Sequence, residues 1–215
     1  MERILAIGDI HGCYTKLVRL MEKVKMNPEK DLLVFIGDYI DRGDQSKEVV
    51  DYLIQLKKKA PSTIFLLGNH EQMLLEYLDG ININPFLYNG GHKTLVSYFG
   101  PGPLASFLEH PLVFPADHLE FFNSLRPYYE MKDYIFTHAG LKARIPLRSQ
   151  DLSDLLWIRE KFLYSKFNYG KTVIFGHTPF PEPFISKQKI GIDTGAVYGN
   201  KLTCLELPAM KFYTV

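Results

Sequence analysis

The chain is poor in cysteine, close to neutral in charge, and free of long apolar runs. Its two cysteines, Cys13 and Cys204, lie far apart among 215 residues, so a disulfide framework is not expected. The formal net charge is +1 and no run of five basic residues occurs, which argues against a nucleic-acid partner. No apolar run reaches the length of a signal peptide or a membrane span, so we expect no membrane association and a cytoplasmic location.

The remaining composition is that of an ordinary globular protein. Hydrophobic residues make up 46% and charged residues 23%, and the length suffices for one full core. No repeat or linker divides the sequence, so we expect a single domain over residues 1–215. Residues 79–116 differ because they are rich in Gly, Pro, Asn and aromatic side chains. Such an insertion is typical of a lid or substrate wall, and a packing element is the alternative.

Five short apolar runs, each typical of a buried strand, end in polar side chains. The runs are residues 3–8, 32–36, 63–68, 134–137 and 172–176. The polar residues that follow them are Asp9 and His11, then Asp38, then Asn69 and His70, then His138, and finally His177. Open α/β sheets gather their ligands just past the carboxyl ends of their strands. Five such coincidences predict a shared site there rather than core packing.

Apolar residues recur at helical spacing between the first three runs, over residues 12–25 and 45–60. The resulting β-α-β-α-β order predicts parallel strands joined by crossover helices. Further helices are expected over residues 94–99, 104–109, 117–125 and 151–162. Residues 190–194 and 202–207 look like a closing pair of strands around a turn at 195–200.

The ordered motifs resemble those of the calcineurin-like metallophosphoesterases. They are GDIHG at 8–12, GDYIDRG at 37–43, GNHE at 68–71, His138, and GHT at 176–178. Within that family the series is similar to the small bacterial and phage-type branch of the phosphoprotein (serine/threonine) phosphatases. The resemblance implies an α/β fold, α+β by some schemes. It is a β-sandwich flanked by helices, with a βαβαβ start and a metal site at the strand C-terminal ends.

The residue types at these positions suit two divalent metal ions. Asp9, His11 and Asp38 can hold one ion, and Asp38, Asn69, His138 and His177 can hold the second. One shared carboxylate would keep the ions about 3.5–4 Å apart. Carboxylate, imidazole and amide ligands favour Mn²⁺, with Fe, Zn²⁺ or Ni²⁺ as alternatives. Such a pair would supply a bridging hydroxide for in-line attack on a phosphorus atom.

The other motif residues then receive roles in phosphoester hydrolysis. His70 is expected to be the general acid that protonates the leaving oxygen, and Asp41 to orient it. Arg42 is expected to bind phosphate oxygens, with Asn69 nearby. The family places a second arginine at the phosphate, and Arg159 is the best match, although Arg126, Arg144 and Arg148 are also available. Asp193 ends a strand and is a candidate neighbour of the ligands.

Three functions compete. The leading expectation is a metal-dependent protein serine/threonine phosphatase, with phosphotyrosine as a further substrate and a phosphoprotein or phosphopeptide as the partner. The alternative is a symmetrical dinucleoside tetraphosphate hydrolase, which shares the site. We favour the phosphatase because the alternative group usually lacks the aspartate before Arg-Gly and has Asp at the end of the third motif, whereas this chain has Asp41 and Glu71. A non-catalytic scaffold is the third reading, disfavoured because the ligand set is complete.

Overall fold

The computed structural model describes residues 3–103 and 112–215, and its strands form two five-stranded mixed sheets. The first sheet has the strand order β10 (Lys211–Thr214), β9 (Thr203–Leu207), β1 (Arg3–Ile7), β2 (Asp31–Phe35), β3 (Ile64–Phe65). In it β1, β2 and β3 run parallel, while β9 pairs antiparallel with β1 and β10. The predicted βαβαβ start is therefore confirmed.

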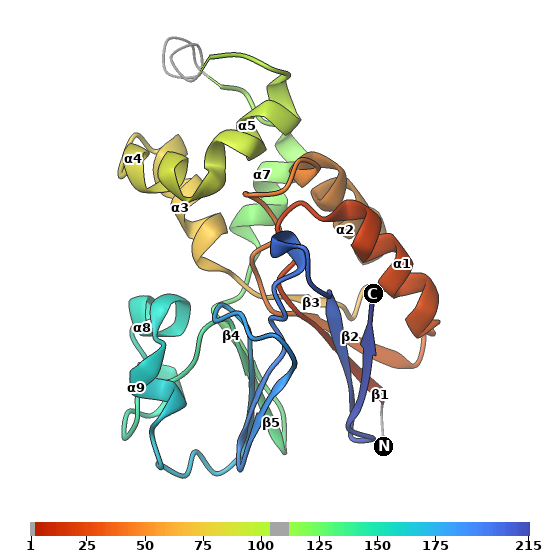
Figure 1. The fold of residues 1–215 in the computed structure, drawn as a ribbon, viewed down its shortest axis with the longest axis vertical. Helices are drawn as coiled ribbons and strands as arrows, with labels where there is room; N and C mark the ends of the chain where they lie inside the picture. The colour runs from red at the N-terminus through yellow and green to blue at the C-terminus, as the bar shows by residue number, and fades with distance from the viewer. Residues whose placement is uncertain (1–2, 104–111) are drawn as a thin grey trace.

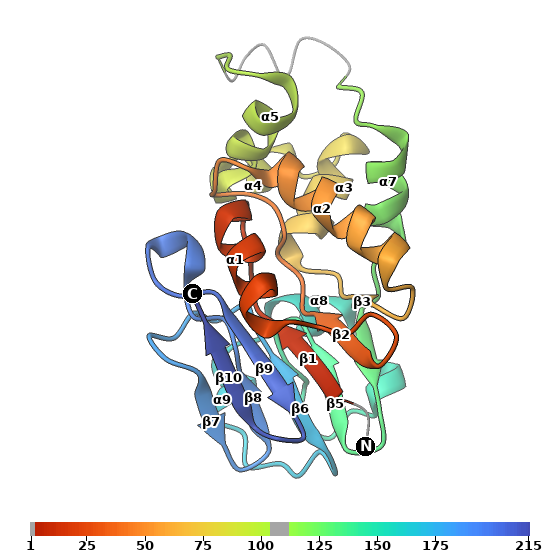
Figure 2. The same ribbon diagram turned by 90° about the vertical axis from the view of Figure 1, so that its right-hand side faces the viewer.

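The second sheet has the order β4 (Tyr128–Glu130), β5 (Tyr134–Thr137), β6 (Thr172–Phe175), β8 (Lys189–Gly191), β7 (Phe184–Ser186). Its three central strands, β5, β6 and β8, are also parallel to one another. The two sheets pack face to face as a sandwich (Figures 1 and 2). Each sheet therefore contributes one set of parallel strand ends to a common edge. This geometry allows side chains from both sheets to meet.

Helices cover the outer faces and one end of the sandwich. The first sheet carries α1 (Tyr14–Val24) and α2 (Ser46–Lys59), and α8 (Leu152–Trp157) and α9 (Glu160–Leu163) lie beside the second (Figure 1). Within the described ranges, four more helices gather beyond the strand ends, joined in part by the π-helical turn η1 (Leu87–Gly91). They are α3 (Asn69–Leu78), α4 (Ile83–Phe86), α5 (His92–Phe99) and α7 (Ala116–Asn123). Two short 3-10 turns are η2 (Leu147–Ser149) and η3 (Ala196–Tyr198).

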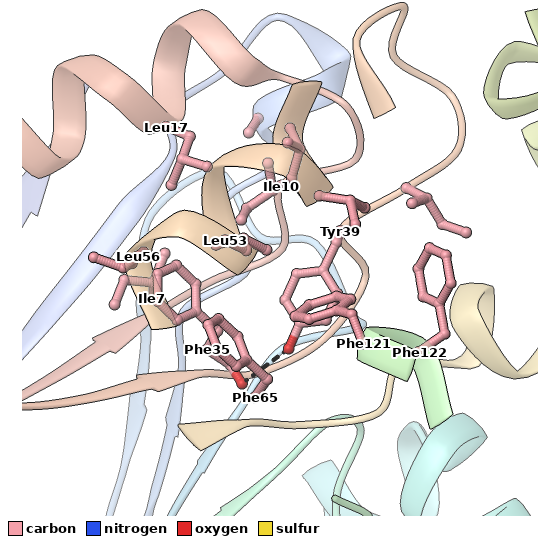
Figure 3. Close-up of a cluster of buried hydrophobic side chains, with 14 of the residues drawn as sticks. Ile7, Ile10, Leu17, Phe35, Tyr39, Leu53, Leu56, Phe65, Phe121 and Phe122 are labelled. Atoms are coloured by element: carbon pink, nitrogen blue, oxygen red, sulfur yellow. Dashed lines mark hydrogen bonds between the residues drawn. The ribbon is translucent and has the colours of Figure 1, made fainter. Parts of the chain in front are cut away.

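Alternation along the strands explains the layers. In β1, Ile4 and Ala6 pack between the two sheets, whereas Leu5 and Ile7 pack under the helices of the first sheet. Both faces are buried, which is why the strand reads as an unbroken apolar run. Figure 3 shows the helix-side cluster, in which the Tyr39 ring lies among aromatic rings. The Tyr39 hydroxyl also donates to Leu66 O at 2.7 Å. The turn that carries Asp38 is thereby anchored in the core.

The predicted sandwich of α/β type is confirmed, but two local predictions are wrong. The helix expected over 151–162 is two helices, because Ile158 is extended and the Leu155 carbonyl accepts from Ala139 N at 2.8 Å. The strands expected to pair across 195–200 belong to different sheets: β8 pairs with β6 and β9 with β1. Apolar alternation marks both strands but does not say which sheet each joins. The helix expected at 104–109 falls outside the described residues.

Among residues 3–103 and 112–215, none of the helices is long and apolar enough to cross a membrane.

Candidate metal centre

The six predicted metal ligands meet at the common edge of the two sheets. They come from both sheets: Asp9 and His11 follow β1, Asp38 follows β2, Asn69 opens α3 after β3, His138 follows β5, and His177 follows β6. Each of them is at most 6% exposed. Buried polar groups of this kind are costly unless they find partners, so the cluster needs a charge-balancing explanation.

Asp38 lies at the centre of the cluster. Its carboxylate is 3.4 Å from His11 Nε2 and 3.3 Å from His138 Nε2. It belongs to two groups whose ligand atoms lie within 4.8 Å of one another, His11–Asp38–His70 and Asp38–His138–His177. Burial acts to raise the pKa of Asp38, but His138 and His70 hold that pKa well below its usual range. A carboxylate common to two groups is suited to bridging two ions.

Asn69 brings a second acceptor to the same place. Its Oδ1 lies 3.0 Å from His138 Nε2 and 2.8 Å from His177 Nδ1. His138 Nδ1 is 2.8 Å from the carbonyl of Ile36, which can only accept, so Nδ1 carries the proton. In the neutral ring, Nε2 is then an acceptor that faces the Asn69 oxygen. Burial acts to lower the pKa of His138, but Asp38 raises it to about 9, because the cluster attracts positive charge.

Unpartnered acceptors complete the test of whether metal ions suit this site. Asp9 Oδ2 accepts from His177 N at 2.9 Å, while Asp9 Oδ1 and His177 Nε2 are buried without a hydrogen-bond partner among the described residues. Burial, reinforced by Asp193, raises the pKa of Asp9 well above its usual range. Burial also lowers the pKa of His177 to about 2. These atoms lack a positive partner, so the residues fit a metal centre.

His70 and Asp41 form a buried pair at the side of the cluster. His70 Nδ1 is 2.6 Å from Asp41 Oδ2, and His70 Nε2 is 4.0 Å from Asp38 Oδ2, with no hydrogen-bond partner among the described residues. Burial lowers the pKa of His70 to about 4 and raises the pKa of Asp41. The free Nε2 is open to a leaving oxygen, as the predicted acid requires, but a pKa of about 4 leaves it unprotonated near neutral pH. The same atom is also placed to serve as a ligand beside His11, in a group that omits Asp9. The role of His70 therefore stays a prediction.

Five residues of the site adopt a left-handed backbone that ordinary side chains disfavour. Their φ angles are 46° at His11, 53° at Asp38, 70° at Asp41, 66° at Arg42 and 62° at His177. Each costs about 1–3 kcal/mol and persists only where its surroundings enforce it. Glycines permit the close packing that enforces it: a Cβ on Gly43 would lie 2.2 Å from His11 O, and one on Gly68 2.2 Å from Asp38 Oδ1. Strain gathered at one place is typical of functional sites.

Glu71 supports the Asp38 turn from below. Its carboxylate is fully buried and accepts from the backbone N–H groups of Gly68 at 3.1 Å, Asp38 at 3.0 Å and Tyr39 at 2.8 Å. Burial raises the pKa of Glu71 to about 8, while its bond from Tyr39 N acts in the opposite direction. Glu71 therefore joins the second and third motifs and does not face a substrate.

The two predicted phosphate-binding arginines lie on different sides of the cluster. Arg42 Nη1 is 2.7 Å from His11 Nε2, and its guanidinium carbon lies 5.7 Å from the centre of the Tyr198 ring. Arg159 precedes α9, and its charge is one of the causes that lower the pKa of His177, after burial. Both side chains are partly exposed.

Sequence analysis missed one residue of the site. Thr94 of α5 is fully buried and its Oγ1 is 2.6 Å from Asp41 Oδ1. No local motif marks Thr94, because it lies in the 79–116 segment, more than fifty positions from Asp41. Asp193, which sequence analysis did name, is buried and accepts from Gly195 N at 2.9 Å, beside Asp9.

The fold and this cluster define a class of protein, and comparison with known proteins agrees. The family model of calcineurin-like phosphoesterases matches residues 2–200. The chain therefore belongs to the calcineurin-like metallophosphoesterase family, whose members are hydrolases with a dinuclear metal centre.

Two relatives and two solved structures are similar to most of this chain. The asymmetrical bis(5'-nucleosyl)-tetraphosphatase PrpE of Halalkalibacterium halodurans is 27% identical, over 97% of this chain and 92% of its own. PrpE of Bacillus velezensis is 29% identical over 94% and 88%. A crystal structure provisionally assigned as a diadenosine tetraphosphatase has a TM-score of 0.76 and 22% identity, covering 100% of this chain and 93% of its own. A cold-active protein tyrosine phosphatase has a TM-score of 0.71 at 18% identity, covering 100% and 78%, which shows the fold alone.

These relatives overturn the leading functional expectation. The curated relatives are tetraphosphatases, so the assignments of a protein serine/threonine phosphatase and of a phosphoprotein or phosphopeptide partner were wrong. The reason lies in the two residues on which the choice rested. Asp41 contacts His70 and Thr94, and Glu71 holds backbone N–H groups. Both residues contact other protein groups rather than the open side of the site. Neither therefore indicates which group is attached to the phosphorus of the substrate.

Proposed function

We propose that this protein hydrolyses dinucleoside tetraphosphates, and that it cuts them asymmetrically into a nucleoside triphosphate and a nucleoside monophosphate. The observation that carries the proposal is the similarity to the PrpE tetraphosphatases over nearly the whole chain. It replaces the symmetrical cleavage named among the sequence-based alternatives, since those relatives carry the asymmetrical designation. The bond broken is a phosphoanhydride rather than a phosphomonoester.

The proposed ligands are those that meet at the strand ends: Asp9, His11, Asp38, Asn69, His138 and His177. When bound, two divalent ions would supply Lewis-acid activation of water and would offset phosphate charge. We propose Mn²⁺ as the native metal because the donors are imidazole, carboxylate and amide, with Fe, Zn²⁺ and Ni²⁺ as the competing choices.

The remaining residues divide the work of binding and proton transfer. Arg42 and Arg159 bind oxygens of the tetraphosphate chain, which carries several negative charges. His70 donates a proton to the leaving oxygen, and Asp41 holds the imidazole in place through the 2.6 Å contact. A phosphate leaving group is already stable as an anion near neutral pH, since its second pKa is about 6. The acid is therefore needed less for a phosphoanhydride than for an alkyl phosphate.

Two exposed aromatic side chains support a nucleotide substrate. Tyr198 on η3 is 63% exposed and neighbours Arg42, and Trp157 on α8 is 44% exposed with its ring 5.8 Å from that of His177. Aromatic faces beside a phosphate site are suited to stacking on nucleobases. The two rings come from different elements and contact different site residues, so the two ends of a dinucleotide would meet unlike surroundings.

We also propose that residues 1–215 act as one catalytic unit in which part of the 79–116 segment forms a wall of the site. Gly90 of η1 supports this, because its carbonyl accepts from Arg42 N at 3.2 Å. A Cβ on Gly90 would lie 2.8 Å from Arg42 Cγ, so the segment packs directly against the arginine.

The test is product analysis with Mn²⁺-loaded enzyme and diadenosine tetraphosphate, with a phosphoserine peptide in parallel. We expect ATP and AMP in equal amounts and much slower release of phosphate from the peptide. Two ADP molecules would overturn the asymmetrical assignment. Faster hydrolysis of the peptide than of the dinucleotide would overturn the nucleotide substrate class.

A further inference from the structure

Helix α5 contributes a hydroxyl to the back of the His70–Asp41 pair. Thr94 Oγ1 accepts from Asp41 N at 2.9 Å and lies 2.6 Å from Asp41 Oδ1. The side chain is completely buried, so no water competes for these contacts. A single residue of the 79–116 segment therefore contacts both the backbone and the carboxylate of Asp41.

The hydrogen bonds have one consistent direction. A hydroxyl has one proton and two lone pairs, and Asp41 N occupies a lone pair of Thr94. The Thr94 proton then points to Asp41 Oδ1, since a carboxylate only accepts. Asp41 Oδ2 faces His70 Nδ1 at 2.6 Å, so each carboxylate oxygen has its own partner. The two contacts fix the plane of the carboxylate.

The same contacts hold a strained backbone. Asp41 has a φ of 70°, in the left-handed region, and its N–H is shared between Thr94 Oγ1 and Ser46 Oγ at 3.1 Å. Ser46 also lies 3.1 Å from Thr94 Oγ1, which closes a small buried network. A residue in this conformation persists only where neighbouring groups enforce it.

Further contacts keep α5 in register with this turn. Lys47 N donates to Ser97 Oγ at 2.9 Å, and Lys93 pairs with Asp44 at 2.7 Å. Ser97 is therefore a matched reference for Thr94. It lies one turn further along the same helix and contacts the same stretch of chain, but it has no contact with Asp41 or His70 in the described structure.

We propose that Thr94 is a positioning residue for the acid pair, which holds the Asp41 carboxylate so that it aims His70 Nε2 at the leaving oxygen. The described start of the 79–116 segment is then a fixed part of the proton-transfer machinery. A closing movement of the predicted lid would have to leave α5 in place. The inference rests on the proposed acid role of His70, but not on the choice of a dinucleotide substrate.

The experiment compares two phosphate esters that differ in their need for an acid. Phenyl phosphate has a poor leaving group, and 2,4-dinitrophenyl phosphate has a good one. We expect Thr94→Val to lower kcat on the phenyl ester about 10- to 100-fold and on the dinitrophenyl ester about threefold or less, because general acid catalysis assists mainly the poor leaving group. Thr94→Ser restores the hydroxyl and should stay close to wild type on both esters, as should Ser97→Ala.

A spectroscopic readout on the metal-free protein is independent of turnover. The proton in the short His70–Asp41 contact should give a resolved downfield NMR signal. That signal should shift or broaden in Thr94→Val and persist in Thr94→Ser and Ser97→Ala. Thermal unfolding of all variants identifies any general loss of structure, and Thr94→Ala replaces Thr94→Val if the latter does not fold.

Two results would overturn the proposal. One is an equal loss on both esters, which would make Thr94 a structural residue only, and the other is no loss on either. His70→Asn separates this failure from a failure of the assigned chemistry. A graded loss in His70→Asn without one in Thr94→Val rejects Thr94 alone, whereas a uniform loss in His70→Asn rejects the acid role together with the positioning role. Neither outcome bears on whether dinucleotides are the substrate.

Discussion

The strand ends and the start of the 79–116 segment serve the same site in different ways. At the strand ends, each short motif supplies a proposed metal ligand directly, and local sequence is enough to find Asp9, Asp38 and His177. The segment delivers Thr94 and the Gly90 carbonyl, which touch Asp41 and Arg42 rather than the ligand cluster. Removing a strand-end residue should therefore abolish metal binding and activity together. Removing a segment residue should leave the metals bound and change only the chemistry.

Asp38→Asn should have the largest effect. If it did not, the proposed difference between the strand ends and the segment would be wrong. The carboxylate lies between both groups of candidate ligands, so its loss should release metal and reduce turnover by about a thousandfold or more. Metal content by mass spectrometry and turnover are measured on the same sample. The control is Asp44→Asn, which removes an exposed carboxylate six positions away whose partner is Lys93. Full metal content with near-normal turnover in Asp38→Asn would remove Asp38 from the centre of the site.

His70→Asn should have the second largest effect. It tests whether His70 belongs with the proposed metal ligands or with the residues that support them. We expect both metals to remain bound. Turnover of phenyl phosphate should fall about 100- to 1,000-fold, within the roughly 10²- to 10⁴-fold that general acid catalysis contributes, and that of diadenosine tetraphosphate by about tenfold or less. The difference arises because the departing nucleotide phosphate needs little protonation. Loss of one equivalent of metal would instead assign His70 as a ligand beside His11 and Asp38, the grouping that the geometry also allows.

The same boundary separates what sequence could predict from what it could not. That the proposed ligands meet at one place was predictable, because parallel strands bring their carboxyl ends to one edge whatever the loops do. The contact of Thr94 with Asp41 could not be predicted, because it depends on where α5 packs. The residues around Thr94 do not determine that packing. Nor could sequence assign β9 to the first sheet, since apolar alternation is the same whichever sheet a strand joins.

The substrate class was missed for a related reason. Asp41 and Glu71 were treated as marks of a phosphatase, yet they face the protein and not the solvent side of the site. The exposed aromatic side chains that we propose to stack on the bases, such as Tyr198, lie outside the five motifs. Motif identity therefore predicts the reaction centre better than the group attached to it.

Glu71→Gln should lower stability more than it lowers chemistry. The amide retains one accepting oxygen but places an NH₂ group against N–H donors of the two turns. We expect a loss of about 2 kcal/mol, the cost of leaving a buried polar group unsatisfied. For a chain of this size that lowers the melting temperature by about 4–8 °C. Glu76→Gln, on the same helix but partly exposed, is the control and should shift it little. An unchanged melting temperature would mean that Glu71 does not hold the motifs together.

Tyr198→Ala should have the smallest effect, and it tests a residue outside both of the regions compared. Tyr198 belongs to neither the strand ends nor the insertion, and its loop is held in place by Lys16, whose ammonium donates to Ala196 O at 2.7 Å. A base stacked on a fixed ring gains about 1–3 kcal/mol, so KM for diadenosine tetraphosphate should rise about tenfold with little change in kcat. KM for p-nitrophenyl phosphate, which has no base, should not change.

Tyr198→Phe should restore the dinucleotide value, and Tyr164→Ala, which removes another exposed ring, should leave both values unaltered. Equal rises for both substrates would instead indicate that Tyr198 acts by holding Arg42, 5.7 Å from its ring, and that recognition at this edge is limited to phosphate.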